Sequence, residues 1–262
     1  MKYINEEKIK KIKLKKDNMY VAIDFDKTIT SGNSQDSWDA AGLLLGDEFT
    51  EKLDMLYKKY APIELDYEIS FKEKNSAMEI WYQECMDLYY EYKLTKEKME
   101  KGIEKSNLIL REGVKEFLKE MNENEIPVII LSAGIGNVIE KFLKDENCYF
   151  KNMIIISNFI KFDFDGNMEK FQDNMIHTLN KSIESKLPID IQKIIDSKKY
   201  KILFGDTIED KKMVPEKEWE NTILVGFLNK KIEENMEFYK KSFDIVLTGK
   251  DASFNEVKEI VF

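Results

Sequence analysis

The sequence predicts an α/β protein that combines a doubly wound parallel sheet with a helical insertion. Six short apolar runs recur along the chain, with helical patterns between most of them. The runs are apolar throughout rather than alternating, which is typical of strands covered by helices on both faces. About a hundred residues separate the first two runs, whereas a crossover between parallel strands needs only about a dozen. The excess predicts a second, helical unit.

The expected strands follow the apolar runs in order. They lie at residues 19–25, 127–132, 153–158, 200–205, 222–226 and 243–247. Residues 31–106, inserted between the first and second strands, are expected to form a helical cap domain above the carboxyl ends of the strands. Residues 1–30 and 107–262 are then the α/β core domain.

The composition excludes several classes of function. The chain has 43% hydrophobic residues and a net charge of −9, which argues against a nucleic acid polymer or an anionic membrane as partner. Cys85 and Cys148 have no disulfide or zinc spacing, and no apolar run approaches the roughly 20 residues that span a bilayer. We therefore expect a cytosolic monomer that acts on a small molecule.

Two carboxylates stand at the end of the first expected strand. Asp24 and Asp26 directly follow the apolar run, two residues apart, so an extended chain points both to one side. Their mutual repulsion calls for a positive partner, which a divalent cation supplies. Capping of the following turn is an equally open explanation for a lone pair of this kind.

A second acidic pair, Asp206 and Asp210, follows Gly205 at the end of the 200–205 run. Hard oxygen ligands of this type suit Mg²⁺ rather than zinc. Taken alone, an N-cap followed by acidic residues in the first helical turn explains them as well.

Two further pieces indicate a phosphate site. Ser132, Ala133 and Gly134 end the second run with a hydroxyl and small side chains, which lets backbone N–H groups approach a phosphate. Lys181 would by composition be one of many surface lysines. Its position in the chain, after Ser132 and before Asp206, singles it out.

These four pieces, in this order and at strand ends, resemble the four motifs of the haloacid-dehalogenase (HAD) superfamily of phosphatases. The resemblance implies a Rossmann-like core of the HAD type. It makes Asp24 the nucleophile and Asp26 the general acid/base, while Ser132 and Lys181 hold the phosphoryl oxygens.

The same resemblance implies Mg²⁺ as the cofactor. Asp206, Asp24 and the backbone carbonyl of Asp26 would be its protein ligands, with Asp210 supporting it through water. The metal and Lys181 would relieve the repulsion between a carboxylate and a phosphate dianion.

A closer resemblance, to the cytosolic pyrimidine 5′-nucleotidase family, covers most of the chain. It rests on residues 132–140, 157–159, 177–181 and 243–247 in the core and on residues 62–64 and 79–82 in the cap. The implied substrate is a small nucleoside 5′-monophosphate, with UMP and CMP favoured.

The resemblance also implies which cap residues meet the nucleoside. Glu64 would accept hydrogen bonds from the base or sugar, and Trp81 and Tyr82 would provide aromatic surface near the base. Packing inside the cap explains these aromatics equally well. Cys85 stands where the family pattern has a ligand-touching serine, so the base preference stays open.

Two alternatives remain at this point. One is a HAD phosphatase for another small phosphate, such as 7-methylguanosine monophosphate, phosphoserine or a sugar phosphate. The other is a HAD-like module that binds without catalysis. Residues 31–46 depart from the family pattern, and no ligand contacts are expected there.

Overall fold

The computed structural model of the chain describes all residues except 1, 13, 67, 172–173, 183–188 and 262. Its centre is a seven-stranded sheet with the order β1-β7-β6-β5-β2-β3-β4, in which every pair is parallel except β1 with β7. The strands are β1 (Lys2–Ile4), β2 (Met19–Ile23), β3 (Val128–Ile135), β4 (Met153–Asn158), β5 (Tyr200–Gly205), β6 (Thr222–Leu228) and β7 (Ile245–Thr248). The predicted α/β fold with a parallel sheet is confirmed.

Several strand bounds differ from the prediction. β2 ends at Ile23, two residues before the predicted end, and β6 and β7 end later than predicted, at Leu228 and Thr248. β3 continues to Ile135, because Ile135 pairs with Asn158 of β4 beyond an irregularity that follows Leu131. β1 was not predicted. It has three residues, exposed or half-buried, and its pairing with β7 depends on a distant part of the chain that no local pattern reveals.

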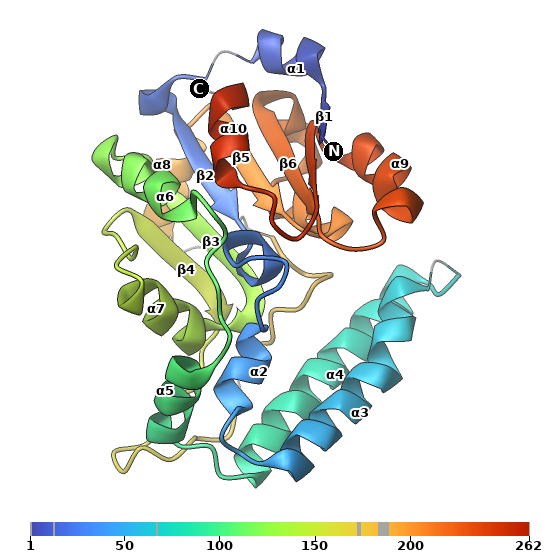
Figure 1. Cartoon of the computed structure of the whole chain (residues 1–262), viewed down its shortest axis with the longest axis vertical. Coiled ribbons are helices and arrows are strands. Elements are labelled where there is room, and N and C mark those ends of the chain that lie inside the picture. Colours follow the sequence, from blue (N-terminus) through green and yellow to red (C-terminus); the bar gives the residue numbers. More distant parts are fainter. Residues whose placement is uncertain (1, 13, 67, 172–173, 183–188, 262) are drawn as a thin grey trace.

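Helices cover both faces of the sheet (Figure 1). α6, α7 and α10 pack on one face, and α8 and α9 pack on the other. The helices are α1 (Glu6–Lys11), α2 (Ser37–Gly42), α3 (Asp47–Leu65), α4 (Phe71–Glu91), α5 (Lys96–Lys105), α6 (Val114–Glu123), α7 (Gly136–Asp145), α8 (Ile189–Asp196), α9 (Ile232–Ser242) and α10 (Phe254–Val261).

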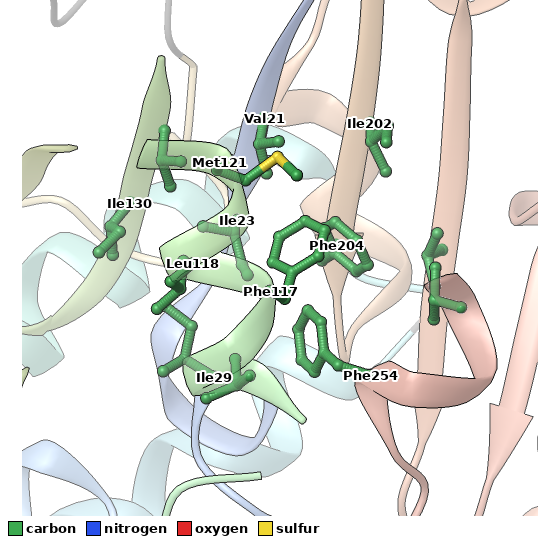
Figure 2. Packing of buried hydrophobic residues seen from close by; sticks show 14 of the residues in the cluster. Val21, Ile23, Ile29, Phe117, Leu118, Met121, Ile130, Ile202, Phe204 and Phe254 are labelled. Carbon is green, nitrogen blue, oxygen red and sulfur yellow. The ribbon is translucent and has the colours of Figure 1, made fainter. Parts of the chain in front are cut away.

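The alternation of side chains along β2 divides the core in two. Val21 and Ile23 face the α6 side, where Phe117, Phe204 and Phe254 pack together (Figure 2). Tyr20 and Ala22 belong to the core on the opposite face. Each fully buried side chain of this size contributes about 1.5–3 kcal/mol, which fixes the strand register and with it the strand ends.

The predicted helical insertion between the first two core strands is confirmed. α3 and α4 lie side by side as an arm that extends away from the sheet (Figure 1). α2 and α5 pack against each other closely, because Gly102 has no side chain and a Cβ there would lie 2.8 Å from the carbonyl oxygen of Ala40. The domain boundaries near residues 31 and 106 stay a prediction. Within the described ranges, every helix is too short or too polar to cross a membrane.

Candidate active site

The strand order brings the polar strand ends together. β2 lies between β5 and β3, with Ile23 paired to both Phe204 and Ile130, so these three parallel strands end at one edge of the sheet. β3 and β4 are added on one side of β2, and β5, β6 and β7 are added on the other side. The strand order therefore reverses at β2, and α/β proteins bind ligands at such a topological switch point. Asp24 follows Ile23 directly and therefore lies at this point.

Lys181 joins two of the predicted carboxylates. Its Nζ donates to Asp24 Oδ1 at 2.6 Å and to Asp210 Oδ1 at 2.8 Å, and all three side chains are buried. The other oxygen of Asp210 accepts from the backbone N–H groups of Asp206 and Thr207, at 3.1 and 2.9 Å, and from the Thr207 hydroxyl. Asp210 thereby fixes the loop that carries Asp206.

Burial dominates the electrostatics of this cluster. It raises the pKa of Asp24 to about 6, although the charge of Lys181 opposes the shift. Burial, with the charges of Asp210 and Asp24, raises the pKa of Asp206 well above its usual value. For Lys181, burial lowers the pKa, but the charges of Asp210 and Asp24 outweigh it and hold the pKa above its ordinary range.

The acidic residues fit a magnesium ion. Asp24, Asp206 and Asp210 can each offer a carboxylate oxygen, and these oxygens lie within 4.8 Å of one another. Among the described residues, Lys181 is the cation that forms ion pairs with Asp24 and Asp210, and one ammonium does not balance three carboxylates. Hard oxygen donors with excess negative charge are the environment that Mg²⁺ prefers.

The predicted phosphate loop is tied to its neighbours. Gly134 donates its N–H to Ser132 Oγ at 3.1 Å. Asn158 of β4 donates to the carbonyl oxygens of Ala133 and Ile176, at 3.0 and 2.8 Å, and its Oδ1 accepts from the N–H of Ile176. This buried amide therefore links the phosphate loop to the segment that leads to Lys181.

Asp26 is held by Ser37, the first residue of α2. Its Oδ1 accepts from the N–H of Ser37 at 2.8 Å, and its Oδ2 accepts from the Ser37 hydroxyl at 2.6 Å. Burial raises the pKa of Asp26 to about 8, and the charge of Asp36 adds to the shift. Asp26 is therefore a carboxyl group that can carry a proton near neutral pH.

Arg111 supports the turn that follows the two aspartates. Lys27 has a left-handed backbone with φ 61°, and the buried guanidinium of Arg111 donates to the carbonyl oxygens of Lys27 and Thr28. Arg111 also donates to Asn229 Oδ1 at 3.0 Å, and the amide nitrogen of Asn229 lies 3.5 Å from Asp206 Oδ2. These bonds connect the turn to the loop that carries Asp206.

A cavity of about 760 Å³ opens above these residues. The predicted side chains that line it are Asp24, Asp26, Trp81, Tyr82, Cys85, Ser132, Ala133, Gly134, Lys181 and Asp206. Glu64 is not among the lining residues, but its Oε1 accepts a hydrogen bond from the hydroxyl of Thr178, which does line the cavity. Burial raises the pKa of Glu64.

The two predicted aromatics of the cap also pack within it. Trp81 stacks on Tyr60 with ring centroids 5.9 Å apart, and Tyr82 meets Trp38 edge-on at 5.4 Å. Each therefore presents part of its surface to the cavity and uses the rest for packing. Their role towards a base stays a prediction.

Comparison with known proteins decides the family. The sequence model of the family Pyrimidine 5′-nucleotidase (UMPH-1) matches residues 34–262. The chain belongs to the pyrimidine 5′-nucleotidase (UMPH-1) family. The expected resemblance to a HAD-superfamily 5′-nucleotidase is thereby confirmed, and the chain is an enzyme of that class.

Two relatives of this nucleotidase are named for 7-methylguanosine phosphate rather than for a pyrimidine nucleotide. It is 35% identical over 205 residues to the 7-methylguanosine phosphate-specific 5′-nucleotidase A of Xenopus laevis, covering 78% of this chain and 71% of the relative. It is 32% identical over 255 residues to the 7-methylguanosine phosphate-specific 5′-nucleotidase of Homo sapiens, covering 94% and 84%.

Solved structures agree on the fold. Cytosolic 5′-nucleotidase IIIB bound to cytidine superimposes with a TM-score of 0.83 and 29% identity, covering 98% of this chain and 89% of the other. An aspartyl-phosphate intermediate analogue of phosphoserine phosphatase superimposes with a TM-score of 0.61 at 19% identity, covering 95% of this chain and 100% of the other. The second likeness concerns the fold alone.

Several side chains at the site of this nucleotidase were missed in the sequence. Asp36, Ser37 and Trp38 lie in the segment where no ligand contacts were expected, yet Ser37 binds Asp26, and Asp36 and Trp38 line the cavity. A helix of six residues such as α2 is too short to show a periodic signal. Arg111 could have been found from the composition, because it is the only arginine among the 41 Lys and Arg residues of the chain.

Proposed function

We propose that this nucleotidase hydrolyses nucleoside 5′-monophosphates by covalent catalysis at Asp24 with Mg²⁺ as cofactor. One observation carries the proposal. Asp24 lies buried at a cavity wall with Lys181 at 2.6 Å, Asp26 two residues further on, and the carboxylates of Asp206 and Asp210 beside it. A nucleophile, a proton donor and an anion-binding cation thus meet at one strand end.

The residues divide the reaction into two steps. A carboxylate oxygen of Asp24 attacks phosphorus, and the bond from phosphorus to the 5′-oxygen breaks while Asp26 gives that oxygen a proton. Water then attacks the aspartyl-phosphate as Asp26 takes a proton from it, which releases phosphate and restores Asp24.

Other groups support the phosphoryl oxygens. Ser132, the backbone N–H of Ala133 and Lys181 would bind them, which makes these residues part of the substrate site. Asp24, Asp206 and the backbone carbonyl of Asp26, with Asp210 supporting through water, would hold Mg²⁺, which would supply positive charge to offset the repulsion between carboxylate and phosphate.

For the base we propose a pyrimidine, as in UMP and CMP. Aromatic side chains, among them Trp38, Trp81 and Tyr82, line the cavity together with the catalytic cluster, and stacking on such rings contributes about 1–3 kcal/mol per base. The family assignment and the cytidine-bound relative support this choice. Cys85, a weak hydrogen-bond donor, also lines the cavity.

A second candidate is 7-methylguanosine monophosphate. The names of the relatives suggest it, and so does the charge of the cavity, which Asp36, Asp39 and Asp54 line together with the aromatic rings. The 7-methylated base is positively charged, and carboxylates with aromatic faces are the groups that attract such a cation. We also propose that the enzyme is a cytosolic monomer, as its sequence suggests.

The test is phosphate release from a panel of esters with and without Mg²⁺. CMP, UMP, 7-methylguanosine monophosphate, AMP, GMP, phosphoserine and glucose 6-phosphate are compared, with Asp24→Asn as the control. GMP is the matched partner of the 7-methylated nucleotide, because the two differ by one methyl group and its charge. Preferred turnover of phosphoserine or glucose 6-phosphate would overturn the nucleotide assignment while keeping the chemistry.

A further inference from the structure

Ser37 is the side chain outside the sequence motifs that contacts the proposed general acid/base most directly. Its hydroxyl donates to Asp26 Oδ2 at 2.6 Å, and its backbone N–H donates to Asp26 Oδ1 at 2.8 Å. Two hydrogen bonds, one to each carboxyl oxygen, fix the orientation of a carboxyl group. Ser37 is fully buried, so water does not compete for either bond.

The direction of the Ser37 hydroxyl is also fixed. Ile135 donates its N–H to Ser37 Oγ at 3.2 Å, which uses the oxygen as an acceptor and leaves its hydrogen for Asp26. Gly134 leaves the room for this arrangement, because a Cβ there would lie 2.1 Å from Ser37 Oγ and 2.7 Å from Asp26 Oδ2. The position of the Ser37 hydroxyl at Asp26 therefore depends on the phosphate loop, through Gly134 and Ile135.

Neighbouring contacts hold Ser37 in register. On one side Lys27 forms an ion pair with Asp36 at 2.7 Å, and on the other the indole N–H of Trp38 donates to the carbonyl oxygen of Ala133 at 3.2 Å. Both contacts join α2 to the catalytic loops of the core. Because both neighbours of Ser37 in the sequence are bonded to the core, Ser37 has little freedom to move away from Asp26.

We propose that Ser37 is a positioning residue of the phosphoryl-transfer reaction, which aims the carboxyl group of Asp26 at the leaving oxygen of the substrate. This inference rests on the proposed function, because it takes Asp26 as the general acid/base. A catalytic acid that is oriented by a third group follows the same logic as a base oriented in a hydrolase triad.

The test compares substrates with different leaving groups in Ser37→Ala. A nucleoside leaves as a strongly basic alkoxide and needs the proton of Asp26, whereas p-nitrophenolate leaves without one. For CMP we expect kcat/KM to fall about 10- to 100-fold, part of the full effect of a general acid. For p-nitrophenyl phosphate we expect kcat/KM to change less than about threefold, because this ratio reports the first transfer step.

The second step gives a separate signature. Hydrolysis of the aspartyl-phosphate needs Asp26 as a base for either substrate, so kcat for p-nitrophenyl phosphate should fall in Ser37→Ala. Since kcat/KM is nearly unchanged, KM should fall with it. A purely structural role of Ser37 would lower the two kcat/KM values together and would not lower this KM.

Three variants make the result specific. Ser34→Ala removes another buried hydroxyl, from the loop before α2, which donates to the carbonyl oxygen of Gln35 and accepts from the N–H of Ile109. No hydrogen bond joins Ser34 to Asp26, so this variant should change kcat/KM for both substrates by the same factor. Ser37→Thr keeps the hydroxyl and should restore the CMP reaction. In an Asp26→Asn background, Ser37→Ala should add less than about twofold, because the two residues act as a unit.

The outcomes separate this inference from the proposed function. Equal losses for CMP and p-nitrophenyl phosphate, or a full additional loss in the Asp26→Asn background, would overturn the role of Ser37 and leave the nucleotidase intact. If the wild-type enzyme hydrolyses a different alkyl phosphate instead of nucleotides, the proposed substrate fails, and the same comparison is made with that ester. If Ser37→Ala does not fold, as judged by circular dichroism, Ser37→Thr and Ser37→Cys carry the comparison.

Discussion

At the scale of single residues, the protonation of Asp26 sets the conditions for catalysis. Burial raises the pKa of Asp26 to about 8, and the negative charge of Asp36 contributes to the shift. Asp36 is itself paired with Lys27 at 2.7 Å. With this pKa Asp26 carries a proton at neutral pH, which suits its proposed role as the proton donor to the leaving group.

This leads to a prediction for the pH dependence. The kcat/KM for a nucleotide should fall as the pH rises through about 8, because Asp26 then loses its proton. In Asp36→Asn the repulsion that raises the pKa of Asp26 is removed, so the falling limb should move to lower pH. The pH profiles of both proteins test this, and an unmoved or upward-shifted limb in Asp36→Asn would contradict it.

Individual residues also differ in how visible they are in the sequence. Asp24 and Asp206 could be predicted because each follows an apolar strand run directly. Arg111 was overlooked, although a single arginine among so many lysines points to a site that needs a planar, forked donor. Ser37 left no such trace, since only the folded chain brings it to Asp26.

At the scale of elements, the strand ends explain why the core motifs were predictable. Burial on both faces makes strands such as β2 and β5 continuous apolar runs, and parallel pairing places their carboxyl ends at one edge. The helices of the cap were predictable as helices. Their contacts were not, because α2 is a short helix whose position depends on packing against α5 and β3.

The aromatic side of α4 gives a prediction about the base. Trp81→Ala should raise KM for CMP about 5- to 150-fold, the effect of losing roughly 1–3 kcal/mol of stacking. Ribose 5-phosphate, which lacks a base, should be affected far less. Tyr90→Ala is the matched control, because Tyr90 is an exposed aromatic residue of the same helix that does not line the cavity.

The comparison also separates the two roles of Trp81. If Trp81→Ala raises KM for CMP and for ribose 5-phosphate by the same factor, the Trp81 side chain stabilises the packing of the cap through Tyr60 and does not bind the base.

At the scale of the whole molecule, stability and metal binding are linked through the buried acids. The folded protein raises the pKa of Asp24 to about 6 and that of Asp26 to about 8, above their ordinary value of 3.8. A raised pKa favours the folded state below the ordinary value and loses that contribution as the pH rises through the raised one. The metal-free protein should therefore lose stability as the pH rises above the ordinary value of 3.8, with the Asp24 contribution gone by about pH 6 and the Asp26 contribution gone by about pH 8.

Magnesium should reverse this loss. At a concentration about 100 times its dissociation constant, a ligand of the folded state adds about 2.7 kcal/mol, which corresponds to a rise in Tm of roughly 5–10 °C for a chain of this size. We expect a larger rise at pH 8 than at pH 6, measured by thermal unfolding after treatment with a chelator. In Asp206→Asn the rise should be lost, and an undiminished rise would place the metal elsewhere.

The central claim is that Asp24 becomes phosphorylated during turnover, and rapid acid quenching with CMP labelled in its phosphate tests it most directly. We predict a transient labelled adduct that is released by hydroxylamine, maps to the peptide that contains Asp24, requires Mg²⁺ and is absent from Asp24→Asn. Continued nucleotide hydrolysis by Asp24→Asn, or turnover of the wild-type enzyme with no adduct at any quench time, would contradict the covalent mechanism.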